Sequence, residues 1–226
     1  MPGIPNRPFP LKRIVAGLVA VAAVVAAAAL LLPREAEAKD AIGLDAKQKA
    51  DVQRAQVYLN AITSMRSRFL QITNTGQFSE GEILIQRPGK MRIDYDPPVP
   101  VLIVSDGSLV MYKDEELDQL SYTPLSSTPA SLFLGETVDF FQDDLLITDF
   151  EHETGVLRIT LQRTEDPMEG SLELAFDDKP MQLRKWTVVD AQGVVTTVSL
   201  QGPRFGETFG PDTFKVEHRA LQTPAN

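Results

Sequence analysis

The stretch GEILIQRPGKMRIDYDPP, residues 81–98, decides the fold of this chain. Successive side chains of a β-strand point to opposite faces, so Ile83 and Ile85 share one apolar face. The same period of two places Arg87 on that face, next to a turn at Pro88-Gly89. The fold must therefore account for a guanidinium group that is directed at an apolar surface.

The rest of the chain from Met65 onward has the character of a β-sheet. Short runs of β-branched and aromatic residues are separated by tight-turn residues, which indicates antiparallel neighbours joined by hairpins. The simplest arrangement is one meandering sheet of about eleven strands, which is too large to stay flat. We expect strands at 65–73, 79–86, 90–95, 100–105, 109–113, 117–123, 145–151, 156–163, 171–177, 181–189 and 194–201, with a further candidate at 213–217.

Only two segments have helical character. Asp45 can cap a helix that runs to about residue 62, and its apolar positions recur at spacings of three and four. The second segment is short, Pro129–Leu134 (PASLFL). A curled sheet has a concave face, and so little helix cannot fill it completely. The sequence therefore predicts a mainly β fold: an open, incomplete antiparallel β-barrel whose apolar cavity is covered by a long N-terminal helix and a short helical lid. The apolar stripe of the long helix consists of Val52, Ala55, Leu59 and Ile62.

Length and composition exclude several classes of protein. The chain has 226 residues, 43% of them hydrophobic, which suits a single globular domain with a sizeable core. Its 22 basic and 31 acidic side chains give a formal charge of −9, which would repel a nucleic-acid backbone. It has no cysteine, so disulfides, thiolate metal sites and cysteine nucleophiles are excluded.

The N-terminal region has the pattern of an export signal. Residues 14–32 form an uncharged apolar stretch preceded by basic residues, and residues 36–38 (AEA) fit a cleavage site. We therefore expect 1–38 to be a signal peptide that is cleaved, with a retained membrane anchor as the alternative. The basic flank places the remainder outside the cytoplasm. We expect a single domain at 39–218 and a flexible tail at 219–226.

No catalytic motif is recognisable. His152 and His218 lie far apart in the sequence, and a lone histidine on a strand is usually a surface residue. The motifs of zinc proteases, serine hydrolases, phosphate-binding loops and EF-hands are absent from the sequence. Carboxylates cluster at 114–116, 139–144 and 149–153, where solvated turns explain them better than a glycosidase pair does. The sequence therefore predicts a protein that is not an enzyme and has no metal or cofactor. A secreted hydrolase on a β scaffold is a distant alternative.

Arg87 allows two interpretations. An uncompensated buried charge costs roughly several kcal/mol, so the guanidinium must find acceptors or reach water. Arginine has five N–H donors, and the carbonyl groups at a helix end can accept several of them. Pro129–Leu134 is a candidate source of such carbonyls, in which case Arg87 would latch a lid. Alternatively, Arg87 lies at the strand end, extends to water and covers its isoleucine neighbours with its stem.

An ordered set of motifs resembles one protein family. RFLQIT at 68–73, GEILIQRPGKMRIDYDPP at 81–98 and VLIVSDGSLVMYKDEELDQLSYTPLSSTPASLFLG at 101–135 are similar to the outer-membrane lipoprotein carrier proteins, the LolA family. The order of Arg-Pro, Tyr with a following Pro-Pro, Ser-Asp-Gly and Thr-Pro before a short apolar helix carries the resemblance, which covers residues 45 to about 135 well. The chain departs from the pattern after the proline, where Met91, Arg92 and Ile93 replace the aromatic residues that better-known members tend to carry.

The resemblance implies a function as well as a fold. Such proteins are half-barrels with helices in the mouth. They take acylated lipoproteins from an inner-membrane lipoprotein-releasing transporter, shield the acyl chains in the periplasm and pass them to an outer-membrane acceptor or to the outer membrane. Arg87 matches the family arginine that hydrogen-bonds the helical lid. The resemblance thus implies a periplasmic chaperone, which we expect to act as a monomer without a cofactor or nucleic acid.

A carrier of this kind needs an apolar wall for acyl chains. Methionine and isoleucine suit that role, and methionine adapts its shape readily. If the facing direction of a strand is assigned wrongly by one residue, its inward-facing residues are exchanged for the residues next to them in the sequence. The expected wall consists of Phe69, Ile83, Ile85, Met91, Ile93, Leu102, Val104 and Met111, with Leu132, Phe133 and Leu134 on the lid.

Two other functions are compatible with the same half-barrel. One is a membrane-tethered lipid-sensing regulatory module, which requires that residues 14–32 are not cleaved. The other is a general periplasmic carrier of lipids. The N-terminal sequence of the exported protein distinguishes the first from a soluble carrier, and mass spectrometry of co-purifying molecules distinguishes the second.

Overall fold

The computed structural model describes residues 42–165 and 170–216. Eleven strands, two α-helices and one 3-10 turn make up this part of the chain. The signal-peptide prediction for 1–38, His218 and the tail at 219–226 lie outside the described residues. The elements are α1 (Ala46–Ala61), β1 (Ser64–Thr73), β2 (Phe78–Gln86), β3 (Lys90–Tyr95), β4 (Val101–Asp106), β5 (Leu109–Asp114), β6 (Gln119–Pro124), η2 (Leu125–Ser127), α2 (Ser131–Leu134), β7 (Leu145–Glu153), β8 (Val156–Arg163), β9 (Gly170–Asp178), β10 (Met181–Asp190) and β11 (Val195–Phe205).

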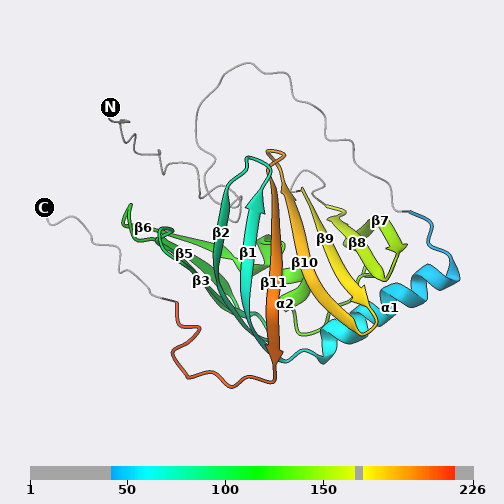
Figure 1. The fold of residues 1–226 in the computed structure, drawn as a ribbon, viewed down its shortest axis with the longest axis horizontal. Helices are drawn as coiled ribbons and strands as arrows, with labels where there is room; N and C mark the ends of the chain where they lie inside the picture. Colours follow the sequence, from blue (N-terminus) through cyan, green and yellow to red (C-terminus); the bar gives the residue numbers. More distant parts are fainter. Residues whose placement is uncertain (1–41, 166–169, 217–226) are drawn as a thin grey trace, which may run out of the picture.

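The eleven strands form one antiparallel sheet, as the sequence predicts. Its order is β6-β5-β4-β3-β2-β1-β11-β10-β9-β8-β7. Two meanders, β1 to β6 and β7 to β11, are therefore joined where the first strand pairs with the last, and β6 and β7 form the opposite edges. The expected sequence of neighbouring strands is interrupted once, between β6 and β7. Figure 1 shows the sheet curling so that α2 lies within the curve and α1 crosses the ends of β9 and β10.

The helix α1 begins and ends where the sequence pattern places it. The backbone N–H of Gln48 donates to Asp45 Oδ1 and that of Asp45 donates to Gln48 Oε1, both at 2.8 Å. This reciprocal capping satisfies two backbone donors that a helix N-terminus leaves without partners. Val52, Ala55 and Leu59 are buried against the sheet. The N-cap and the apolar stripe predicted from the sequence are thus confirmed.

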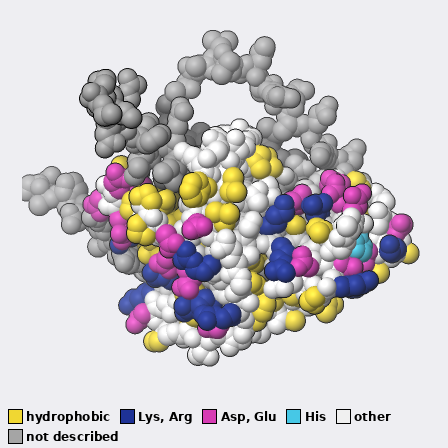
Figure 2. Space-filling model, in the orientation of Figure 1, with side chains coloured by type: hydrophobic (Ala, Val, Ile, Leu, Met, Phe, Trp, Pro, Cys, Tyr) yellow, Lys and Arg dark blue, Asp and Glu magenta, His cyan; other side chains and the backbone are white. Residues whose placement is uncertain are grey.

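The two faces of the sheet differ in character. Ile83 pairs with Ile93, Ile93 with Ile103, and Ile103 with Tyr112, which forms an apolar row across four strands of the concave face. These side chains belong to one cluster with the buried residues of α1 and α2. The convex face carries mixed Lys, Arg, Asp and Glu side chains around β1, β2, β10 and β11 (Figure 2). Apolar side chains are therefore concentrated on the side that the helices cover.

Three predicted wall residues lie on the wrong face. Leu102, Val104 and Met111 are on the convex side, where Val104 pairs with Met111 and both are fully buried under Val216. The concave residues of β4 are Val101 and Ile103 instead. Every position in VLIV at 101–104 is apolar, so the sequence contains no alternation from which the facing direction can be read.

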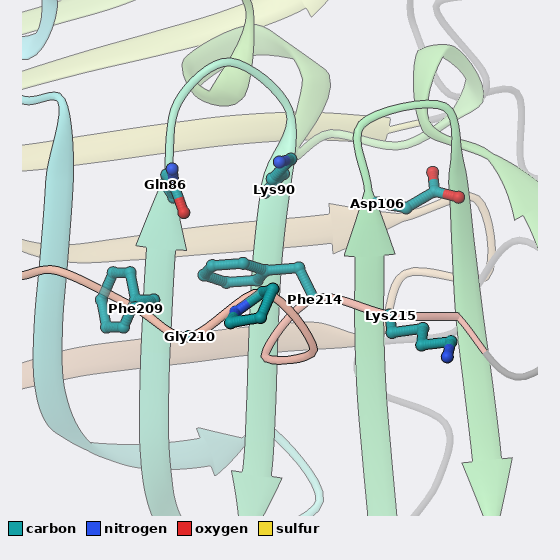
Figure 3. A pocket seen from close by; sticks show the side chains of 8 residues that line it. Gln86, Lys90, Asp106, Phe209, Gly210, Phe214 and Lys215 are labelled. Carbon is teal, nitrogen blue, oxygen red and sulfur yellow. The ribbon is translucent and has the colours of Figure 1, made fainter.

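The segment 206–216 is a covering strap and not a strand. The N–H of Thr213 donates to Gly210 O and that of Lys215 donates to Asp212 O, both at 3.2 Å, so the chain turns repeatedly here. The predicted strand at 213–217 is therefore wrong over its described part. Figure 3 shows the segment crossing the convex face. With the sheet beneath, it forms an open pocket of about 330 Å³ lined by Gln86, Lys90, Asp106, Phe209, Gly210, Pro211, Phe214 and Lys215.

The described part of the chain also bears on membrane association. Among residues 42–165 and 170–216, no helix combines the length and the apolar character that crossing a bilayer requires.

We predict that Gly81→Ala destabilises the sheet. A Cβ at Gly81 would meet the carbonyl oxygen of Asp94 and two ring atoms of Phe69 at 2.7 and 2.8 Å. Overpacking of this kind costs about 1–3 kcal/mol. Gly43→Ala is the matched control because a Cβ there has open space within 4 Å. Thermal unfolding should show a lower midpoint for Gly81→Ala only. Equal midpoints would contradict the packing of Phe69 over this strand.

Candidate functional site

The candidate site is the concave face together with the segment that covers it. Because β6 and β7 are opposite edges of the sheet, the chain between them has to pass from one edge to the other. This crossing segment, residues 125–144, contains η2 and α2. Phe133 and Leu134 of α2 are buried in the cluster of the concave face, and Leu132 packs against it while partly exposed. The cover over the apolar face is thus a consequence of the strand order.

Arg87 lies where the crossing segment and the end of α1 meet. Its Nε and Nη2 donate to Gly135 O at 3.1 and 2.7 Å, and Nη2 also donates to Glu136 O at 3.3 Å. Its Nη1 donates to Leu59 O and, at 3.4 Å, to Ile62 O. The guanidinium thus bonds carbonyl groups at the C-terminal ends of both α-helices. These are the acceptors that a helix end leaves without partners.

The side chain of Asn60 adds to this arrangement. Its Oδ1 accepts from Arg87 Nη2 at 3.2 Å and from the N–H of Val138 at 2.8 Å, while its Nδ2 donates to Val138 O at 2.9 Å. We call Arg87 and its acceptors, Leu59, Asn60, Ile62, Gly135 and Glu136, the Arg87 contact set. Burial lowers the pKa of Arg87 below its ordinary value. An arginine side chain nevertheless stays charged at neutral pH.

The turn at 87–89 holds Arg87 in position. The N–H of Gly89 donates to Leu134 O at 2.7 Å, and Gly89 O accepts from Ser105 Oγ at 2.7 Å. Gly89 has a φ of +72°, and a Cβ there would meet Gly107 Cα at 2.6 Å. Glycine at this position therefore serves both the turn conformation and the close approach of two hairpins.

The observed acceptors differ in part from the expected ones. The sequence predicts carbonyls from Pro129–Leu134, whereas Gly135 and Glu136 lie just beyond that segment. The contribution from the end of α1 has no signal in the sequence, because it depends on how α1 crosses the sheet. Arg87 stays partly exposed, but all three of its guanidinium nitrogens donate to protein acceptors, which is the geometry of the latch interpretation.

A second arginine bonds the crossing segment from the other half of the sheet. Arg163, at the end of β8, donates from Nη2 to Ser126 O at 3.0 Å and to Ser131 Oγ at 2.8 Å. Its Nη1 also lies 3.6 Å from Asp144 Oδ2. The crossing segment is therefore held from β2 on one side and from β8 on the other.

A buried ionic cluster holds the first half of α1. His152 Nδ1 lies 2.9 Å from Asp51 Oδ2, and its Nε2 lies 3.3 Å from Asp178 Oδ2. Arg54 reaches both carboxylates, at 3.0 Å to Asp51 and 2.5 Å to Asp178. Asp51 and Asp178 are only 8% and 7% exposed. The sequence suggests a surface histidine here, but His152 joins β7 to α1, because it faces the covered side of the sheet.

Most of the expected wall residues meet on the concave face. Trp186 of β10 packs against Phe133 with the ring centroids 5.7 Å apart, which connects the cover to the second half of the sheet. The apolar face is closed in this structure. The wall residues that lie in the concave cluster are Phe69, Ile83, Ile85, Met91 and Ile93.

Among the described residues, no three His, Asp or Glu side chains gather in a way that could hold a metal ion. Four aspartates are buried among the described residues: Asp51 and Asp178 are engaged with Arg54 and His152, and Asp114 and Asp190 accept backbone N–H groups. What the site offers is a covered apolar surface.

Comparison with known proteins gives consistent results. Residues 60–217 match the family model described as outer membrane lipoprotein carrier protein LolA. An outer-membrane lipoprotein carrier protein of Pseudomonas fluorescens is 31% identical over 177 residues, which cover 74% of this chain and 84% of the relative. That of Methylobacillus flagellatus is 31% identical over 156 residues, covering 65% and 75%. An uncharacterized protein of Rickettsia prowazekii is 26% identical over 167 residues, covering 74% and 76%.

We predict that Arg87→Leu loosens the cover more than it loosens the sheet. The variant loses every bond of the Arg87 contact set. A net loss of about 1.5–3 kcal/mol, the contribution of one hydrogen bond to a charged group, already speeds local opening about tenfold to a hundredfold, so we expect at least that acceleration. Amide hydrogen exchange should therefore accelerate in α2 and the last turn of α1. Arg68→Leu is the control because the Arg68–Asp96 ion pair is exposed and contributes little. Unchanged exchange in both helices would contradict the role of the Arg87 contact set.

We also predict that the ionic cluster weakens in acid. The hydrogen bond from Arg54 lowers the pKa of Asp178 below its ordinary value of 3.8. A lowered folded-state pKa stabilises the fold fully above the unfolded value, and that stabilisation is lost as the pH falls through the folded value. Asp178→Asn should therefore have a lower melting temperature than the wild type at pH 6. The difference between the two melting temperatures should become smaller below about pH 3.8.

Asp212→Asn is the control for this experiment. The side chain of Asp212 is 83% exposed, and its Oδ1 lies 3.9 Å from Lys215 Nζ. Asp212→Asn should therefore differ little from the wild type in melting temperature at every pH. A gap between Asp178→Asn and the wild type that stays constant down to pH 2.5 would argue against the ionic origin of the effect.

Proposed function

Because this chain belongs to the LolA family of outer-membrane lipoprotein carrier proteins, we propose that it is a periplasmic carrier for the acyl chains of lipoproteins. In this proposal it takes its cargo from an inner-membrane lipoprotein-releasing transporter. It delivers the cargo to an outer-membrane acceptor or to the outer membrane itself. The observation that carries the proposal is the Arg87 contact set, through which one side chain holds both helices over an apolar face.

The energetics of the cargo require such a carrier. Each buried methylene group is worth about 0.8 kcal/mol, so acyl chains exposed to water are strongly disfavoured. Bound chains would replace the apolar side chains of the cover against the concave face. Phe133 and Leu134 would then leave the cluster, and the acyl chains would contact the sheet residues that the cover now contacts.

The cover must also open again. The Arg87 contact set closes the empty protein with a few charge-assisted bonds, which gives a modest energetic gate that cargo binding can offset. A closed state that is too stable would prevent loading, and an open state that is too stable would retain cargo. Transfer can then proceed to an acceptor with a larger apolar site, without a nucleotide on this protein. No bond is made or broken, so in this proposal the protein is not an enzyme.

The proposed location of the protein is the periplasm. The apolar stretch 14–32 with its basic flank supports export, and a carrier between two membranes works in the periplasm. The mature domain would carry the acyl chains as a soluble monomer.

We predict that Arg87→Leu retains cargo. Without the Arg87 contact set the closed, empty state loses stability, so the loaded state should be favoured by about tenfold or more. The variant and the wild type are isolated from the periplasm of the same cells, and intact-mass spectrometry is used to look for bound lipoprotein. The variant should carry more lipoprotein than the wild type. Arg68→Leu should behave like the wild type because its pair with Asp96 lies on the convex face.

Two results would count against this function. One is an Arg87→Leu variant that is empty and supports normal transfer. The other is co-purification of free phospholipid alone with both proteins, which would favour a general lipid carrier.

A further inference from the structure

The concave face is not uniformly apolar along its strands. The row nearest the 87–89 turn contains Ile85, Met91, Ser105 and Val110, and the next contains Ile83, Ile93, Ile103 and Tyr112. The third row contains Phe69, Gly81 and Tyr95, with Val101 paired to Asp114 in β4 and β5, and Gln71 follows at the far end of β1. Ser105, the polar residue of the first row, already donates to Gly89 O, whereas the row beyond Tyr112 adds the hydroxyl of Tyr95 and the carboxylate of Asp114. Along β3 to β5 the face therefore becomes more polar with distance from the Arg87 contact set.

Tyr112 lies at the boundary of this change and has an unusual hydroxyl group. Tyr112 is only 9% exposed, and its hydroxyl has no hydrogen-bond partner among the described residues. Tyr95, in the neighbouring row, donates from its hydroxyl to Gln71 Oε1 at 2.8 Å. A buried hydroxyl without a partner destabilises a fold, so a position that could hold phenylalanine instead carries a polar group at a cost.

The Tyr112 hydroxyl is equipped to donate. Burial first, and the nearby Asp114 second, raise the pKa of Tyr112 above its ordinary value of 10.0. The phenol thus keeps its proton at neutral pH and needs an acceptor. Asp114 Oδ1 already accepts from the N–H groups of Glu116 and Leu117 at 3.0 Å. Its negative charge beside Tyr112 would repel a phosphate group but not a neutral carbonyl.

We infer that the Tyr112 hydroxyl donates a hydrogen bond to a carbonyl oxygen of the acyl linkage of a bound lipid, with the acyl chain lying along the aliphatic rows toward the Arg87 contact set. The inference rests on the proposed function and adds the direction in which cargo lies. An acyl chain has an apolar tail and an ester or amide carbonyl at one end. That order matches the order of aliphatic rows and polar boundary on this face. Tyr112 is thus a specificity-determining residue that recognises the ester or amide carbonyl of the acyl linkage.

The first experiment tests the unpartnered hydroxyl in the cargo-free protein. Tyr112→Phe removes an unsatisfied group, so it should melt at or above the wild-type temperature. Tyr95→Phe is the matched control, because it leaves Gln71 Oε1 without its partner and should melt lower by about 2–4 °C. A Tyr112→Phe variant that melts as low as Tyr95→Phe would show that the fold itself uses the hydroxyl and would overturn the inference.

The second experiment measures the affinity of the two proteins for synthetic lipopeptides. One probe is a triacylated lipopeptide with two ester-linked chains and one amide-linked chain, and the other replaces both esters with ethers. If Tyr112 bonds an ester carbonyl, the wild type should prefer the ester probe by about fivefold to tenfold and Tyr112→Phe should have no preference. If it bonds the amide carbonyl, Tyr112→Phe should bind both probes more weakly by that factor.

The remaining outcomes separate the inference from the proposed function. If Tyr112→Phe binds both probes as tightly as the wild type, the inference is wrong and the carrier function stands. If the wild type binds neither lipopeptide, the carrier function for acylated cargo is itself overturned, and the inference falls with it.

Discussion

The closed state of this protein depends on one guanidinium group that bonds carbonyl oxygens at the ends of two helices. A helix C-terminus leaves carbonyl groups without partners, and it also carries partial negative charge. Arg87 supplies N–H donors and a positive charge to both ends at once. Its acceptors are the backbone carbonyl groups of Leu59, Ile62, Gly135 and Glu136 and the side-chain Oδ1 of Asn60. An arginine directed at an apolar face is therefore stable there, because the cover provides its acceptors.

The strand order explains why a cover is present. Pairing of β1 with β11 joins two meanders and moves β6 and β7 to opposite edges, so the chain between those edges crosses the hollow. Arg87 and Arg163 hold the crossing segment from β2 and β8, and the Asp51–His152–Asp178 cluster holds the other end of α1. The cover is thus attached by a small number of polar contacts around an apolar cluster. Such a design permits opening at a few points while the hydrogen-bonded sheet stays intact.

The same face combines properties that a lipid carrier needs. Aliphatic rows lie beneath the cover, and a tyrosine with an unused donor marks where the polar part of the face begins. Family membership and this arrangement lead to the same interpretation from different directions. The first supports the proposed acylated cargo, and the second supports the proposed direction of the acyl chain. The convex face carries mixed charges, and its strap at 206–216 packs Val216 over Val104 and Met111.

Much of the site could be predicted from the sequence, because it is encoded in local patterns. The alternation of Ile83, Ile85 and Arg87, the cap at Asp45 and the hairpin turns depend on residues that are near one another in the chain. The sequence by itself therefore determined a large antiparallel sheet, one long helix and a charged group among apolar neighbours. Only the tertiary structure decided the pairing of β1 with β11, the face taken by VLIV at 101–104, the place of His152 and the acceptors from the end of α1. These depend on contacts between residues that are far apart in the sequence, and a short apolar run or a lone histidine is equally compatible with either face of a strand.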